Sequence, residues 1–121
     1  SGIPQAIQHA AIEALRGSQD CIAEHNAILQ QRRDKLIGVL DKIGLKARVP
    51  KAAFYIWAKV PQGYGSIDFT KRLLNEAGIA VTPGVGYGKE GEGYIRFSLT
   101  ISDDQLEQGI NRLLDWHRRE R

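Results

Sequence analysis

The first third of the chain carries two helical patterns of apolar residues. Between residues 4 and 15 apolar side chains recur at helical spacing, and Gly17 ends the pattern. A second and longer pattern covers about residues 19–43. Its heptad series is Ile22, Leu29, Leu36 and Ile43. A helix of about 25 residues is about 37 Å long, more than a globule of this size needs. We therefore expect the N-terminal half of the long helix to project beyond the core.

The remaining two thirds alternate between strand and helix patterns. The strongest strand signal is A-F-Y-I-W-A-K-V at residues 53–60, and a short strand is expected before it at residues 46–49. Two further β-type runs, residues 79–82 and 94–100, flank a loop with five glycines in ten residues. Helical patterns cover residues 67–77 and 103–118, preceded by the capping residues Ser66 and Ser102. This order predicts an α/β or α+β fold in which helices cover one small, antiparallel or mixed sheet.

Composition and charge narrow the class of protein. Apolar residues make up 42% of the 121 positions and charged residues 26%, as in ordinary globular domains. No apolar run is long enough to span a membrane. The net charge of +3 is concentrated near the C-terminus. Because no aromatic platform accompanies these arginines, we interpret them as a solvated helix end and expect no nucleic-acid partner.

Several familiar kinds of site are disfavoured by spacing. The histidines lack the spacing of metal ligands, so no metal is expected. Cys21, the single cysteine, cannot form an internal disulfide, which favours a cytoplasmic location; we interpret it as a packed helical residue rather than a nucleophile. The loop glycines fit neither a dinucleotide fingerprint nor a P-loop. The absence of methionine suggests a processed protein or a piece of a longer one.

Arg96 is the residue with the clearest chemical interest. Alternation along residues 94–100 places Tyr94, Arg96 and Ser98 on one face of the strand and apolar residues on the other. The guanidinium is a rigid fork of donors that matches a carboxylate or a phosphate. On the residues alone, two interpretations stay open: a solvent-facing strand arginine, or an anion site beside the glycine loop.

Three segments resemble the C-terminal part of fold-type I, pyridoxal-phosphate-dependent aminotransferases of class I/II. They are K-A-A-F-Y-I-W-A-K-V-P at residues 51–61, L-N-E-A-G-I-A-V-T-P-G at residues 74–84 and G-Y-I-R-F-S-L at residues 93–99. Residues 2–15 also fit this family. Together with Tyr64, Tyr87-Gly88 and Gly91-Glu92-Gly93, the chain is most similar to the LL-diaminopimelate aminotransferase branch of the family.

The resemblance implies a fold of the aminotransferase small-domain type. Residues 1–121 would then be a C-terminal fragment, in which residues 1–43 link to a missing large domain and residues 44–121 form the small domain. Arg96 matches the family arginine that binds the substrate α-carboxylate. No catalytic, cofactor-binding or metal-binding residue is assigned within the chain. The family's cofactor lysine follows a serine, and no Ser-Lys dipeptide occurs here, so the fragment is expected to be inactive alone.

The resemblance also implies the activity and partners of the parent protein. With pyridoxal 5'-phosphate as cofactor, the parent would transfer an amino group between an amino acid and a 2-oxo acid in amino-acid metabolism. In the diaminopimelate branch the amino acid is LL-2,6-diaminopimelate, and the pathway is lysine biosynthesis. The parent would be a homodimer, with residues 2–5 near the partner's site. The alternative is a free-standing, non-catalytic domain that binds a small acid or another protein.

Overall fold

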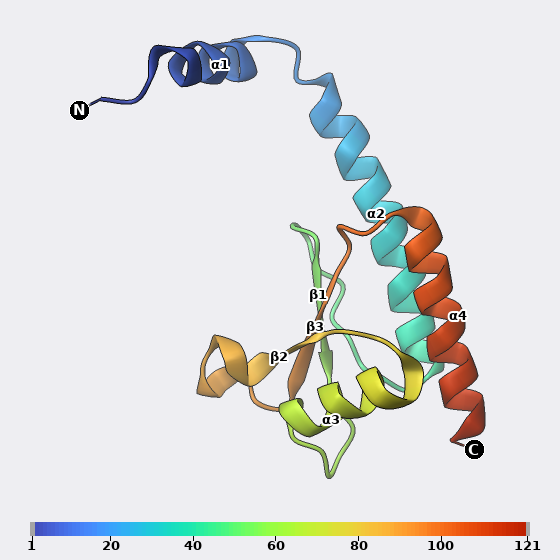
Figure 1. Ribbon diagram of the computed structural model, residues 1–121. Helices are drawn as coiled ribbons and strands as arrows, with labels where there is room; N and C mark the ends of the chain where they lie inside the picture. The colour runs from blue at the N-terminus through green and yellow to red at the C-terminus, as the bar shows by residue number, and fades with distance from the viewer. Residues whose placement is uncertain (1, 121) are drawn as a thin grey trace.

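The computed structural model describes residues 2–120, which fold into a helix-covered sheet with a long helical arm (Figure 1). The helices are α1 (Gln5–Arg16), α2 (Asp20–Lys42), α3 (Ser66–Arg72, continued by a π-helical turn over Leu73–Ala77) and α4 (Asp103–Arg119). The strands are β1 (Tyr55–Lys59), β2 (Thr82–Pro83) and β3 (Tyr94–Ser98). Two short 3-10 turns, Gly84–Tyr87 and Lys89–Gly91, lie between β2 and β3.

The sheet is antiparallel, with β3 between β1 and β2. It is smaller than the sequence patterns predict. The strand expected at residues 46–49 is reduced to one bridge, between Ala47 and Ala58. The strand expected at residues 79–82 pairs only from Thr82 onward. Ile79 and Val81 instead pack against the hydrophobic core, which leaves their backbone outside the ladder.

The core lies between one face of the sheet and the helices. Ile56 and Ala58 of β1 and Ile95 and Phe97 of β3 point to this face, and all four are buried. The helical side of the core is contributed by Leu36, Leu40, Phe69, Leu73, Leu106, Ile110 and Leu113. In Figure 1, α2 and α4 run side by side in the same direction along this layer. The opposite face of the sheet carries Tyr55, Trp57 and Arg96; among residues 2–120 no α-helix covers it, and the 3-10 turn Gly84–Tyr87 lies against part of it.

The N-terminal arm projects from this body, as the length of the second helical pattern predicts. No residue of α1 is buried, and the buried residues of α2 all lie between Leu36 and Leu40. Figure 1 shows α1 and the first half of α2 reaching away from the sheet. Cys21 lies on this arm and is exposed, so its interpretation as a packed residue was wrong.

The ends of the helices follow the sequence in part. Ser102 begins α4 with the reciprocal hydrogen bonds of a capping box to Gln105, each 3.3 Å long. Gly78, with φ of 66°, ends the helical segment that starts with α3. Ser66 was predicted to cap α3, but it is the first residue inside that helix and its hydroxyl bonds elsewhere.

Candidate functional site

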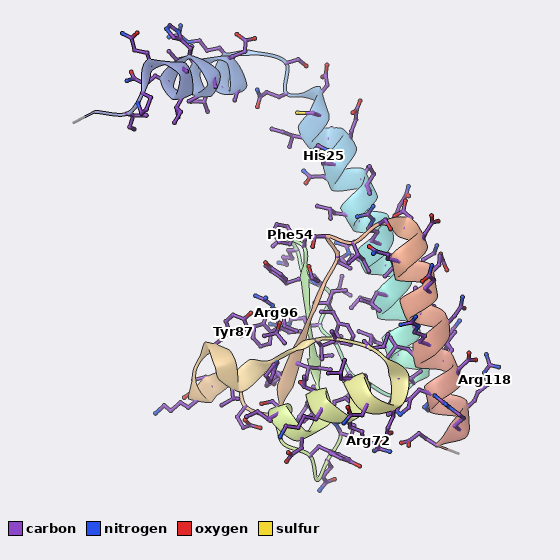
Figure 2. The ribbon with its side chains drawn as sticks, in the orientation of Figure 1. His25, Phe54, Arg72, Tyr87, Arg96 and Arg118 are labelled. Carbon is purple, nitrogen blue, oxygen red and sulfur yellow. The ribbon has the colours of Figure 1, made fainter. Side chains whose placement is uncertain are left out.

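Arg96 lies at the centre of the face of the sheet that points away from the core. It belongs to the middle strand, β3, and is paired with Trp57 on β1 and with Thr82 on β2. Its neighbours in sequence, Ile95 and Phe97, point into the core, so alternation directs Arg96 to the other face. Its side chain is half-buried and lies beside the glycine loop (Figure 2).

Two tyrosine rings hold the guanidinium of Arg96. Its Cζ lies 3.8 Å from the ring centroid of Tyr55 on β1 and 4.5 Å from that of Tyr87 in the glycine loop. Trp57 supports Tyr87 by an edge-on contact with 5.5 Å between centroids. Aromatic faces attract a planar cation without using its N–H groups, because stacking occupies the face of the guanidinium and leaves its edges free.

One polar atom of Arg96 is buried without a partner among residues 2–120. Its Nε is buried and makes no hydrogen bond, and Arg96 takes part in no ion pair among residues 2–120. Arg72 is a contrast, since it pairs with both Glu76 and Glu120. Buried donors in folded proteins are nearly always satisfied, and a missing ligand is one explanation of an exception. Thr70 Oγ1 and His117 Nε2 are also without a partner among residues 2–120, but neither belongs to a cation held between two aromatic rings. Arg96 is therefore a cation held in place with its hydrogen-bonding capacity unused.

The glycine loop places Tyr87 by a close backbone contact. A Cβ on Gly84 would overlap the carbonyl oxygen of Gly91, and a Cβ on Gly91 would overlap that of Gly84. Gly88, directly after Tyr87, has φ of 116°, a conformation that L-residues with side chains rarely adopt. The glycines therefore close the loop at its base and turn it sharply beside Tyr87.

Glu92 fastens the same loop to the start of α3. The Ser66 N–H donates to Oε1 of Glu92 at 2.7 Å, and the Ser66 hydroxyl donates to Oε2 at 2.9 Å. The Val85 N–H donates in turn to the Ser66 hydroxyl at 3.4 Å. The pKa of Glu92 is lowered, first by the bond from the Ser66 backbone and then by the Ser66 side chain, because both donors favour the ionised carboxylate.

Stability should therefore depend on the ionisation of Glu92. A carboxyl with a lowered pKa in the folded state stabilises the fold above its ordinary pKa of about 4.3, and this contribution is lost as the pH falls through the lowered value. We expect urea midpoints of the wild type to fall more steeply with acidification below that pH than those of Glu92→Gln. Glu90→Gln, on the same loop, is the matched control and should keep the wild-type slope. Equal slopes for wild type and Glu92→Gln would contradict the assignment.

The structure brings together some residues that the sequence could not connect. Arg96 and the glycine loop are adjacent, as expected from their closeness in the chain. Alternation along residues 53–60 puts Tyr55 and Trp57 on one face of that strand, but nothing in the sequence joins Tyr55 to Arg96, because the strand register is not known from the sequence. Tyr87 and Glu92 were noted only for the family resemblance. The five glycines of residues 84–93 were the sign in the sequence that this backbone turns tightly. The sequence did not show that the turn places Tyr87 beside Arg96.

Other classes of site find no support in the described chain. Within residues 2–120, no group of three or more histidine, cysteine, aspartate or glutamate side chains could hold a metal ion. Over the same residues, no helix is both long and apolar enough to cross a membrane. A shallow hollow of about 410 Å³ adjoins the Arg96 face and is lined by Trp57, Tyr87, Glu90, Gly91 and Tyr94.

Comparison with known proteins identifies relatives along almost the whole chain. The sequence model of the family described as aminotransferase class I and II matches residues 1–113. An LL-diaminopimelate aminotransferase from Dehalococcoides mccartyi is 56% identical over 116 residues, which are 96% of this chain and 30% of that protein. One from Oleidesulfovibrio alaskensis is 50% identical over 113 residues, 93% of this chain and 29% of that protein. The chain thus spans less than a third of these curated relatives.

Solved structures agree on the fold. An aromatic aminotransferase from Pyrococcus horikoshii superposes with a TM-score of 0.87 at 33% identity, covering 94% of this chain and 31% of that one. An aminotransferase from Staphylococcus aureus superposes with a TM-score of 0.88 at 34% identity, covering 97% of this chain and 31% of that one. The similarity therefore includes the projecting helical arm as well as the sheet.

Proposed function

Because the chain belongs to the family of class I and II aminotransferases, we propose that it is the C-terminal domain of a pyridoxal-phosphate-dependent aminotransferase. The parent protein transfers an amino group between an amino acid and a 2-oxo acid. Residues 44–121 are its small domain, and residues 1–43 join that domain to the remainder. The exposed apolar side chains of α1, among them Ile7, Ile12 and Leu15, support this division, because a further domain would cover them.

Within the parent, Arg96 binds the α-carboxylate of the substrate. The observation that carries this assignment is the buried Nε without a hydrogen-bond partner, in a guanidinium held by two aromatic rings. A carboxylate would accept two parallel N–H bonds from the guanidinium fork, and charge-assisted bonds of this kind are about twice as strong as neutral ones. Both amino acids and 2-oxo acids carry this carboxylate, so one arginine serves both half-reactions.

In this proposal the remainder of the parent holds the cofactor. The family's cofactor lysine follows a serine, and none of the seven lysines of this chain does. When bound to the parent, pyridoxal phosphate supplies the electron sink for carbanion chemistry. The contribution of this chain is the binding of substrate.

We propose LL-2,6-diaminopimelate as the amino acid substrate. Support comes from several relatives at 45–56% identity that are named LL-diaminopimelate aminotransferases. The parent acts as a homodimer in this proposal, with residues 2–5 close to the partner's site. Ile3 in this segment is 65% exposed, which leaves it available for such a contact.

The test uses the full-length protein and the isolated 121-residue chain side by side. With pyridoxal phosphate, the full-length protein should transfer the amino group of LL-2,6-diaminopimelate to a 2-oxo acid, and its visible absorption should change on adding the donor. The isolated chain should do neither. A full-length protein that neither binds the cofactor nor transfers an amino group from any amino acid would overturn the proposal in favour of a non-catalytic domain that binds a small acid or a protein.

A further inference from the structure

We propose that Tyr55 and Tyr87 are positioning residues for Arg96, and that their ring faces set the affinity for the substrate carboxylate. This inference rests on the proposed function, because it assumes that Arg96 binds that carboxylate. The new elements are the two residues that orient the guanidinium and the part of each side chain that acts on it.

The guanidinium of Arg96 is held by aromatic rings and not by a carboxylate. Two other partly buried arginines of the fold are held by carboxylates: Arg32 by Asp103, and Arg72 by Glu76 and Glu120. Arg96 has neither an acidic partner nor a hydrogen bond at its Nε among residues 2–120. A protein carboxylate at this point would occupy the N–H fork and compete with the substrate for it. Aromatic rings attract the cation and leave the fork open.

The first of the two rings, that of Tyr55, comes from the neighbouring strand β1. Tyr55 is half-buried on β1, and the ladder places it opposite Ser98, on the same face of the sheet as Arg96. Its ring is the closer one, with 3.8 Å from the centroid to Cζ of Arg96. The position of Tyr55 relative to Arg96 is therefore fixed by the pairing of β1 with β3.

The second ring, that of Tyr87, belongs to the glycine loop between β2 and β3. Its ring centroid lies 4.5 Å from Cζ of Arg96 and makes an edge-on contact with Trp57, and Tyr87 as a whole residue is 51% exposed. The loop is closed at its base by the Gly84–Gly91 contact and fastened to α3 by Glu92. Tyr87 therefore covers the guanidinium from the solvent side. Partial removal of water from a charge strengthens its interaction with an incoming anion.

The phenolic oxygens of Tyr55 and Tyr87 are not needed to hold the guanidinium. The contacts are between the rings and the guanidinium, so phenylalanine should replace either tyrosine and leucine should not. Tyr64 provides a matched control on the same molecule. Its ring also lies beside an arginine, with 5.2 Å between its centroid and Cζ of Arg72, but that arginine is neutralised by glutamates.

The experiment measures steady-state kinetics of the full-length protein with its cofactor, for an amino acid and for a 2-oxo acid. Tyr55→Leu should raise KM for both by about tenfold, or ~1.4 kcal/mol, with a smaller change in kcat. Tyr87→Leu should act in the same direction. Tyr55→Phe and Tyr87→Phe should stay within about twofold of wild type, and so should Tyr64→Leu. The inhibition constant of propionate, which offers the carboxylate alone, should follow KM.

The Arg96→Ala background distinguishes the positioning role of the tyrosines from carboxylate binding by Arg96. There, Tyr55→Leu should add less than about a further twofold, because the ring acts through the guanidinium. If Arg96→Ala is severe but neither leucine variant changes KM, the positioning role is wrong and the carboxylate site stands. If Tyr55→Phe is as damaging as Tyr55→Leu, the hydroxyl acts and the ring-face mechanism is wrong. If Arg96→Ala itself is neutral, both the site and this inference fall.

Discussion

Replacing Arg96 by alanine in the full-length protein is expected to lower kcat/KM by about 30-fold to several-thousandfold for amino acid and 2-oxo acid substrates alike. Loss of one partner of a desolvated, hydrogen-bonded charge pair costs roughly 2–5 kcal/mol, and about 1.4 kcal/mol corresponds to a factor of ten. The loss is general because every such substrate carries the α-carboxylate. Kinetics with two amino acids of unrelated side chains measure it.

The matched variant is Arg96→Lys. It keeps the charge but offers a compact ammonium in place of the planar fork, so it should recover only part of the lost kcat/KM. The fold should change little in either variant, because Arg96 makes no ion pair within residues 2–120 and its Nε has no partner to lose. Melting curves of the variants check this point. If Arg96→Ala keeps kcat/KM within about threefold, a change of ~0.7 kcal/mol, Arg96 does not bind the carboxylate.

The largest expected effect on stability follows from truncating Phe69 on α3. Phe69 is fully buried, and its ring makes edge contacts with Tyr64 at 5.6 Å and with Trp116 of α4 at 6.2 Å between centroids. Phe69→Ala should lower the free energy of unfolding by about 3–5 kcal/mol, because it removes apolar contacts and leaves a cavity between α3 and α4. Urea unfolding of the 121-residue chain, followed by circular dichroism, measures the change.

Ile67→Ala is the control for that experiment. It lies on the same helix, two residues earlier, but is 48% exposed. Alanine favours helix slightly, so the substitution should change the free energy of unfolding by less than about 1 kcal/mol. A loss below about 1 kcal/mol for Phe69→Ala would mean that α3 does not pack against α4 as described. The proposed carboxylate site is separate from this contact, since Arg96 lies on the other face of the sheet.

Local patterns in the sequence predicted most elements because their causes are local. The cap at Ser102, the helix end at Gly78 and the alternation of residues 94–98 each depend on a few neighbouring residues. The heptad series from Ile22 predicted a helix too long for the core, and the projecting half of α2 confirms that argument. The family followed from three short segments and is shown by the match over residues 1–113.

The short β2 marks a limit of such patterns. Residues 79–82 have the composition of a strand, but only Thr82 and the following Pro83 pair with β3. The side chains of Ile79 and Val81 pack against the hydrophobic core instead. Propensity for strand reflects a fit to a half-buried surface, and several surfaces of the fold offer that fit. Which one a residue joins is decided by the packing of the whole domain.

The sequence by itself determined the helices and principal strands, the face to which Arg96 points, and the family. Each of these follows from spacing along the chain or from residues that stand next to one another. The tertiary structure alone decided what surrounds Arg96. Tyr55 and Arg96 are 41 positions apart, and only the register of β1 against β3 brings ring and guanidinium within 3.8 Å. Register depends on the packing of every buried side chain at once, so no local pattern could supply it.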